Sequence, residues 1–306
     1  MEKPPFLSRQ PVQAAMLYLP LWAACTFYLA LSGGNFLFPI SSLLLFGVIL
    51  TGAAIFLTRK TDAPPVPVAE PKRESIVLLL YLLLYALILF GPLASVVRNS
   101  IVSERAEQVA MLAYKLIVHV LIPALLARSV KGRLAGIFDT GLGRRGVVPA
   151  LLLFSTFMLA VAGLLNSIFE QLSAAGLSVG AIAAWAALAW LWMSLEAGLC
   201  EEFLFRALLQ SRLTAWSGSP AMAIVLTAII FALVHVPSFY LRGGEALAKQ
   251  ASTLPQIAAL AIGSIAPFSI LFGTLWYRTR SLLLIVLVHG AVDALPAIDK
   301  MMRIWG

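Results

Sequence analysis

Charged residues are scarce in this chain, where they make up 12% of the 306 residues, while 61% are hydrophobic. A soluble globular domain is closer to about half apolar and about a quarter charged. The composition and several apolar runs of about 20 residues therefore exclude an ordinary soluble domain and predict a polytopic membrane protein. Alternating strand patterns of about ten residues, which a membrane barrel requires, are missing. We therefore expect an all-α fold, a bundle of transmembrane helices.

Cysteine is also scarce. The only two cysteines, Cys25 and Cys200, both fall inside apolar runs. Two isolated cysteines exclude a disulfide framework and a zinc ribbon. The net charge of +8 does not indicate a nucleic-acid partner, because the Lys and Arg surplus of a membrane protein usually sits in its cytoplasmic loops.

Apolar runs separated by polar loops predict about eight to nine membrane spans. Eight remains open because the last run is short and we expect its helix to end at Pro296. The nine predicted spans cover roughly residues 12–32, 36–58, 76–97, 109–128, 147–169, 181–209, 219–236, 254–276 and 281–297.

The most polar connection is the proline-rich stretch 59–75, for which we predict a linker without helix. It divides the chain into an N-terminal part, 1–75, with a two-span hairpin, and a membrane core, 76–306. All motifs described below lie within 195–293 of that core.

Lysine and arginine are distributed unevenly between the two sides that these spans define. The side richer in Lys and Arg includes Lys3, Lys60 and Arg145, and the poorer side includes Lys249. Positively charged loops stay in the cytoplasm. The distribution predicts that the N-terminus is cytoplasmic and that the C-terminus lies on the opposite side.

The sixth predicted span, 181–209, contains charges that an apolar helix normally avoids. Such charges are costly in a membrane and mark a functional site by default. Glu202 and Arg206 are four residues apart and share a helix face, so they can form a structural ion pair. Glu201 points about 100° away from Glu202 and is free to face another helix. Glu196 either lines the same cavity or pairs elsewhere.

Two further spans contain histidines. His235 lies near the end of the seventh span, where we expect Pro237 to end the helix. His289 and Asp293 share a face of the ninth span. A lone histidine in a helix is commonly structural, and a mutual hydrogen bond could occupy both His289 and Asp293. At about 1.5 Å per residue, however, all of these side chains and Glu201 can meet near the middle of the membrane.

The three motifs occur in a recognisable order. Glu201-Glu202-Phe-Leu-Phe-Arg206, Phe231-Ala-Leu-Val-His235 and His289-Gly-Ala-Val-Asp293 resemble those of the CAAX-protease and bacteriocin-processing (CPBP) family. This family of intramembrane glutamic endopeptidases includes the Ras-converting CAAX endopeptidase. The resemblance covers roughly residues 110–297. It implies a protease core that cuts a membrane-associated peptide or protein in the lipid bilayer, without a metal or a cofactor.

The resemblance also implies a role for each matching residue. Glu201 is the general base that activates a water molecule, and His235 helps to hold that water. Glu202 and Arg206 support the site. These roles agree with what peptide hydrolysis needs, a base near the water and donors directed at the developing oxyanion.

His289 and Asp293 occupy the positions at which the family stabilises the oxyanion. The CAAX branch has Asn where this chain has Asp293. An ionised aspartate cannot donate a hydrogen bond, so Asp293 is either protonated or orients and charges His289, which then donates. Aspartate occurs among bacterial relatives, and we expect an integral protein of the bacterial inner membrane.

Other functions remain open from the residues alone. Glu201, His235, His289 and Asp293 are a chemically reasonable zinc set, although no His-Glu-x-x-His motif is present. Cys200 beside Glu201 could indicate a cysteine protease, but an apolar setting disfavours its reactive thiolate. Buried acids and histidines also serve proton-coupled transporters, although this sequence shows no internal repeat. A non-catalytic immunity or scaffold protein would be free to lose Glu201 or His235, and this chain keeps both.

Overall fold

The structure, a computed structural model, describes residues 9–165, 177–242 and 251–306. Within these ranges every regular element is a helix, and nine helical segments are long and apolar enough to cross a membrane. The protein is thus an all-helical, multi-pass integral membrane protein, as predicted. Lys3, Lys249 and the end of the fifth predicted span, 166–169, lie outside the described residues.

Of the first four spans, the first is a single helix and the other three are built from consecutive helical segments. Short π-helical stretches, labelled η, interrupt three of them. These spans consist of α1 (Arg9–Leu31); α2 (Leu37–Ser42), η1 (Leu43–Leu50) and α3 (Thr51–Leu57); α4 (Pro71–Leu84), η2 (Tyr85–Leu93) and α5 (Ala94–Asn99); and α6 (Glu104–Leu116), η3 (Ile117–Leu121) and α7 (Ile122–Ser129).

The last five spans include the longest and most interrupted one, which contains Glu201. They consist of α8 (Val147–Leu165); α10 (Val179–Met193), η4 (Ser194–Leu199), α11 (Cys200–Glu202), η5 (Phe203–Gln210) and α12 (Ser211–Ser217); α13 (Pro220–Arg242); α15 (Leu254–Thr279); and α16 (Leu282–Trp305).

Three of the helix ends that differ from the prediction involve a proline. The linker predicted over 59–75 ends earlier, because α4 begins at Pro71. Proline suits the first turn of a helix, where its missing N–H has no partner to lose. The helices α13 and α16 continue through Pro237 and Pro296. Membrane helices tolerate such prolines because neighbouring groups satisfy the freed backbone atoms.

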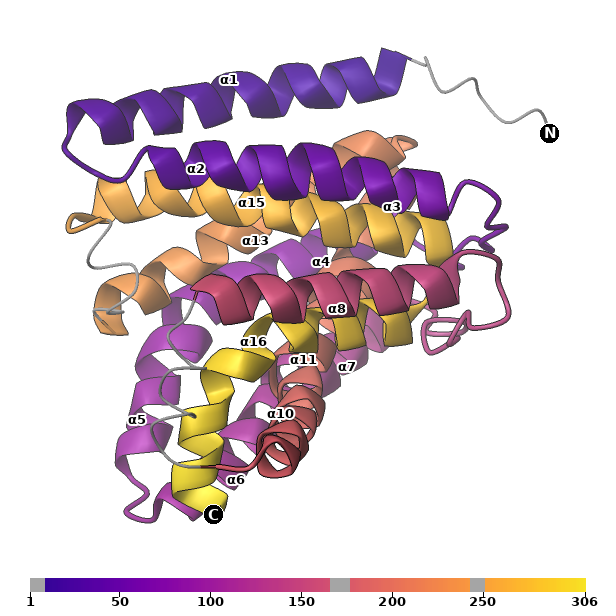
Figure 1. Ribbon diagram of the computed structural model, residues 1–306. Coiled ribbons are helices and arrows are strands. Elements are labelled where there is room, and N and C mark those ends of the chain that lie inside the picture. The colour runs from indigo at the N-terminus through magenta and orange to yellow at the C-terminus, as the bar shows by residue number, and fades with distance from the viewer. Residues whose placement is uncertain (1–8, 166–176, 243–250) are drawn as a thin grey trace.

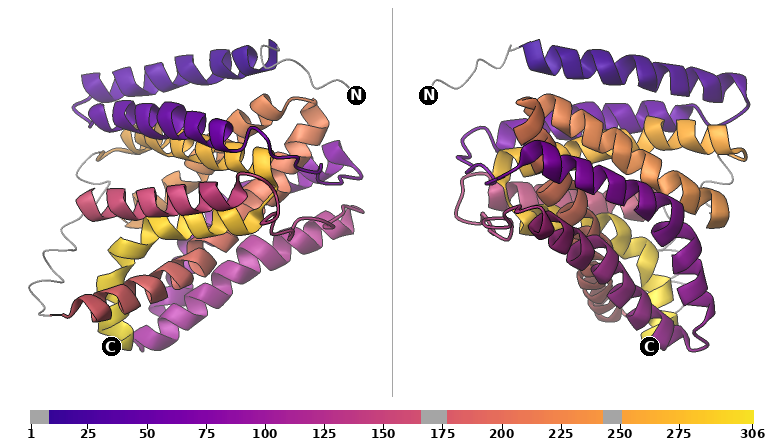
Figure 2. Two further views of the ribbon diagram at one scale, coloured as in Figure 1. Left: turned by 45° about the vertical axis from the view of Figure 1, so that its right-hand side comes forward. Right: turned by 180° about the vertical axis from the view of Figure 1, so that it is seen from behind.

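The helix α15 organises one half of the bundle. It packs against α13 and against α1, α2, η1 and α3, which lie along it in Figure 1. The Tyr18 hydroxyl donates to the Ile262 carbonyl at 3.1 Å, and Pro39 fills the space left by Gly263. Figure 2 shows α1 at the edge of the bundle from both further directions. The N-terminal hairpin therefore lies on α15, and its first helix also contacts α13, which contains the Phe-x-x-x-His motif.

The helix α16 organises the other half. It packs against α8, α10 and η4, and residues near its end, Leu295, Ile298 and Met301, share a buried cluster with Ala189 of α10. Its last part turns away towards the C-terminus, beside α6 (Figure 1). There Arg303 forms an ion pair with Glu104 at 2.8 Å, and Arg105 donates to the Ile304 carbonyl at 2.6 Å. The end of the ninth span is thus fixed to the start of the fourth.

The spans alternate in direction, so the connections 58–70, 130–146, 218–219 and 280–281 lie at one end of the bundle. We call this end the basic face. Arg278 donates to the Thr58 carbonyl at 2.7 Å and Arg144 donates to the Thr279 carbonyl at 2.7 Å, which ties these connections together.

Candidate active site

Glu201 and Glu202 lie in α11, a short α-helical turn between η4 and η5. Single π-helical turns are uncommon and recur at functional sites. Glu202 is fully buried, whereas 15% of the Glu201 side chain is exposed. The two neighbouring carboxylates therefore differ in access to solvent.

Glu201 lies close to His235 and His289, the two histidines predicted to belong to the site. The His235 Nε2 atom lies 3.9 Å from Glu201 Oε1, and the His289 Nε2 atom lies 3.7 Å from Glu201 Oε2. His289 Nε2 is also 3.7 Å from Asp293 Oδ2. These separations exceed a direct hydrogen bond, so no mutual bond occupies His289 and Asp293.

Glu202 joins two partners. Its Oε2 atom lies 3.2 Å from Arg206 Nε, the ion pair that the spacing predicts. Its Oε1 atom accepts a hydrogen bond from His289 Nδ1 at 2.6 Å. The four-residue spacing predicts only the arginine as a partner of Glu202. The bond to His289, which no sequence pattern indicates, holds the imidazole ring with Nε2 towards Glu201.

Arg206 is enclosed by aromatic rings. Its guanidinium carbon lies 4.4 Å from the centre of the Phe231 ring, and its Nη2 donates to Ser269 Oγ at 3.0 Å. A guanidinium over an aromatic face gains a cation–π interaction, which is stronger when water is excluded. Phe231 belongs to the Phe-x-x-x-His motif, whereas nothing in the sequence indicated Ser269.

The orientation of His235 follows from its own helix. Its Nδ1 atom donates to the Phe231 carbonyl one turn earlier, at 2.6 Å. The rings of Phe90 and Phe239 lie 5.5 and 5.6 Å from the imidazole ring. Because this bond fixes Nδ1 on the backbone, the opposite nitrogen of the ring, Nε2, faces Glu201.

Two glycines bring the helices of the site close together. A Cβ atom at Gly290 would overlap the backbone and the side chain of Ser194, and one at Gly198 would overlap the backbone of Val286. Small residues allow membrane helices to approach at such short range. Gly290 follows His289 directly, so the close contact between α16 and η4 positions the histidine next to Glu202.

Glu196 lies apart from this constellation. Its carboxylate binds Lys115 Nζ at 2.8 Å and Trp192 Nε1 at 2.6 Å. Of the two predicted alternatives, the structure shows that Glu196 pairs elsewhere.

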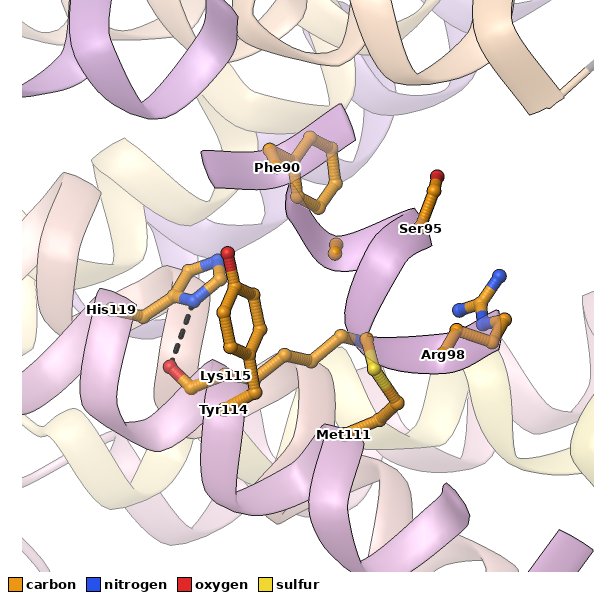
Figure 3. Close-up of a pocket in the computed structure, with 8 residues that line it drawn as sticks. Phe90, Ser95, Arg98, Met111, Tyr114, Lys115 and His119 are labelled. Carbon is orange, nitrogen blue, oxygen red and sulfur yellow. Dashed lines mark hydrogen bonds between the residues drawn. The ribbon is translucent and has the colours of Figure 1, made fainter. Parts of the chain in front are cut away.

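A small pocket lies next to the site, between α6 with η3 and η2 with α5. Its volume of about 20 Å³ suffices for about one water molecule. Phe90 lines the pocket, and its ring lies 5.5 Å from the imidazole ring of His235. His119 also lines it, and its Nδ1 donates to the Lys115 carbonyl at 2.9 Å. Figure 3 shows the labelled lining residues Phe90, Ser95, Arg98, Met111, Tyr114, Lys115 and His119.

Among the residues that the structure describes, no group of three or more His, Cys, Asp or Glu side chains has an arrangement that could hold one metal ion. The zinc set considered from the sequence therefore does not form such a group in this conformation. That set is Glu201, His235, His289 and Asp293.

The helices and their apolar surfaces define a multi-pass membrane protein. Residues 183–295 match the family described as Type II CAAX prenyl endopeptidase Rce1-like, a narrower range than the 110–297 expected from the motifs. The chain thus contains a domain of this CPBP-related family and is a peptide hydrolase of the CAAX endopeptidase type. No curated protein and no solved structure matches the chain.

Proposed function

We propose that this protein is a metal-independent glutamic endopeptidase whose general base is Glu201. The observation that carries the proposal is the approach of two imidazole Nε2 atoms to the two oxygens of one carboxylate, at 3.9 and 3.7 Å. Polar groups at such distances are commonly bridged by water. A water molecule between Glu201 and His235 would lie where a base can take its proton.

His289 is the proposed donor to the oxyanion. Glu202 holds its Nδ1 at 2.6 Å, and Glu201 and Asp293 each lie 3.7 Å from its Nε2. Three surrounding carboxylates favour the positively charged imidazolium, which donates from both nitrogens. A fixed cationic donor is well suited to stabilise negative charge that develops on a carbonyl oxygen.

Asp293 then acts through His289. Its side chain is 39% exposed, and it is the most accessible acid of the group. We assign it the role of charging and orienting the imidazolium. This assignment accommodates aspartate at a position where the CAAX branch has asparagine.

The proposed substrate is a peptide or protein at the membrane, since the site is enclosed by membrane-spanning helices. We further propose that the protein resides in a bacterial inner membrane with its N-terminus in the cytoplasm, based on the uneven distribution of Lys and Arg. A comparison of membrane proteomes between cells with active and inactive protein would identify the substrate from the missing product.

The central test is Glu201→Gln, with Cys200→Ser as its neighbour control. Loss of a general base lowers turnover by about 10²–10⁴-fold. The control replaces a buried thiol that donates to the Leu195 carbonyl at 3.5 Å. We expect full activity from Cys200→Ser and no product from Glu201→Gln in the proteome comparison. Retained cleavage by Glu201→Gln would refute the glutamic mechanism.

A further inference from the structure

A hollow of about 230 Å³ lies on the basic face, far along the chain from the catalytic motifs. Its wall combines the end of α3, the residues that follow it and the connection before α8. Two arginines, one lysine and two apolar side chains line it: Phe56, Leu57, Arg59, Lys60 and Arg145. None of these five lining residues is acidic.

Backbone contacts form this hollow. Gly146 has a φ of +88°, and a Cβ atom there would overlap the Leu57 carbonyl. The Thr61 hydroxyl donates to the Arg145 carbonyl at 2.5 Å. The start of α8 and the end of α3 lie side by side in Figure 1. The fold therefore brings the backbone after α3, which contains Arg59, next to the backbone before α8, which contains Arg145.

Arg144 and Arg145 are neighbours in sequence but differ in their partners. Arg144 binds Asp139 at 2.5 Å, and the N–H of Gly141 donates to the same carboxylate, which keeps the pKa of Asp139 below its usual value. Arg144 is thus neutralised by an ionised partner. For Arg145 and Lys60 the described part of the chain provides no carboxylate within ion-pair distance.

The third cation is held beside an apolar group. The guanidinium of Arg59 stacks on the Phe56 ring at 4.0 Å and donates to the Phe56 carbonyl at 3.3 Å. The Phe56 side chain is exposed, and it precedes the last residue of a membrane span, Leu57. The hollow therefore lies where the apolar part of the span ends and the polar headgroups of a bilayer begin.

We propose that this hollow is a binding site for a phosphate group, at the depth of phospholipid headgroups. Three cations that converge without a carboxylate are suited to an anion, and arginine recognises phosphate through paired hydrogen bonds. Basic pockets between membrane helices bind anionic headgroups. The exposed Phe56 ring would lie beside the acyl chains of the same lipid. This site is independent of the proteolytic function.

The test compares two triple variants with equal loss of charge. The variant Arg59→Gln/Lys60→Gln/Arg145→Gln removes the cations of the hollow. The control, Lys72→Gln/Arg73→Gln/Arg128→Gln, removes exposed cations from the same face that do not line it. All six side chains are exposed, so both variants should fold, and their thermal unfolding in detergent would verify this.

Retained lipid is measured by native mass spectrometry of detergent-purified protein with phosphatidylglycerol or phosphatidylcholine. A parallel arm measures the rise in melting temperature that inorganic phosphate causes. We expect the wild type and the control to prefer phosphatidylglycerol. Loss of three contacts, each worth about 1 kcal/mol, should weaken its binding by roughly 100-fold in the hollow variant.

The outcomes separate the sources of the phosphate group. Loss of the lipid preference in the hollow variant alone assigns the site to a phospholipid. The site is assigned to a soluble phosphate compound if two results are found together. Inorganic phosphate raises the melting temperature of the wild type and the control but not of the hollow variant, and no protein shows a lipid preference. Equal behaviour of both triple variants, or no effect in either arm, overturns the proposal.

Discussion

Two buried glutamate–arginine pairs in this molecule have nearly the same geometry and different surroundings. Glu202–Arg206 is separated by 3.2 Å and Glu74–Arg212 by 3.0 Å, and all four side chains are fully buried. Removing two such charges from water costs much of the free energy that their attraction provides, unless further hydrogen bonds satisfy their remaining polar atoms. The two pairs therefore differ in the partners that supply those bonds.

Backbone groups supply the further hydrogen bonds of the pair Glu74–Arg212. Glu74 accepts from the N–H groups of Ala69 and Glu70 at 3.1 and 2.9 Å. Arg212 donates to the carbonyl of Ala207 at 3.0 Å and to that of Arg133 at 2.7 Å. Such a pair joins α4, the connection after α7 and α12, and it leaves no group for chemistry.

The pair of Glu202 and Arg206 instead leaves one carboxylate oxygen for His289. Arg206 is covered by Phe231 and bound to Ser269. One ion pair therefore fixes helices, and the other positions a histidine. This difference predicts that stability and activity respond separately to matched substitutions.

The largest effect is expected when each glutamate becomes glutamine. Both Glu74→Gln and Glu202→Gln leave a buried arginine unpaired, which typically costs about 3–5 kcal/mol. Only Glu202→Gln replaces the carboxylate that accepts from His289 Nδ1 by a neutral amide, which no longer stabilises the imidazolium, and we expect turnover of the folded protein to fall by at least about 100-fold. Thermal unfolding and turnover, measured at a temperature where both variants are folded, test this. An equal loss of turnover in Glu74→Gln would contradict the distinction.

A second substitution changes the distance between His289 and Glu202 without touching either. Gly290→Ala introduces a methyl group where Ser194 leaves no room. A displacement of about 1 Å can lower turnover by roughly 100-fold. Gly52→Ala is the control, since a Cβ atom there meets nothing within 4 Å. Normal turnover in Gly290→Ala would show that the close contact does not position the histidine.

A smaller effect is expected at Asp293. Asp293→Asn removes a negative charge 3.7 Å from His289 Nε2 but keeps the shape of the side chain. We expect turnover to fall by about 10-fold, equivalent to about 1.4 kcal/mol of lost stabilisation of the transition state. Unchanged turnover would instead indicate that the side chain at this position donates to the oxyanion itself, as a neutral group can.

No effect is expected from a metal chelator. In the proposed mechanism Glu201 activates the water directly, so incubation with a strong chelator should leave the turnover of the purified protein unchanged. Loss of activity that added zinc restores would favour the zinc-dependent alternative. Glu74→Gln protein that is still folded should respond to the chelator as the wild type does.

Much of the architecture is predictable because the membrane imposes simple rules. Apolar runs of sufficient length predicted eight to nine spans, and the described residues contain nine helical segments that are long and apolar enough to cross a membrane. Spacing of four residues placed Glu202 with Arg206 correctly. The rule that proline ends a helix failed at Pro237 and Pro296, because it describes helices in water, where a broken helix can be solvated.

The contacts that join distant segments were not predictable. Glu74 and Arg212 are separated by 138 positions, and the sequence contains no pattern that relates them. The bond from His289 to Glu202 depends on the close contact at Gly290, which requires the packing of α16 on η4. A glycine within an apolar helix is a signal for such a contact, but it does not identify the partner.

The hydrogen bond from His235 to the Phe231 carbonyl has a stereochemical consequence. When a proton on Nδ1 makes this bond and Nε2 carries none, the lone pair of Nε2 faces Glu201, so the histidine and the carboxylate both present acceptors. A water molecule between them in the proposed mechanism would direct one proton to each. Its own lone pairs would then point away from both, and the backbone of one helix turn would decide from which direction a scissile carbonyl is attacked.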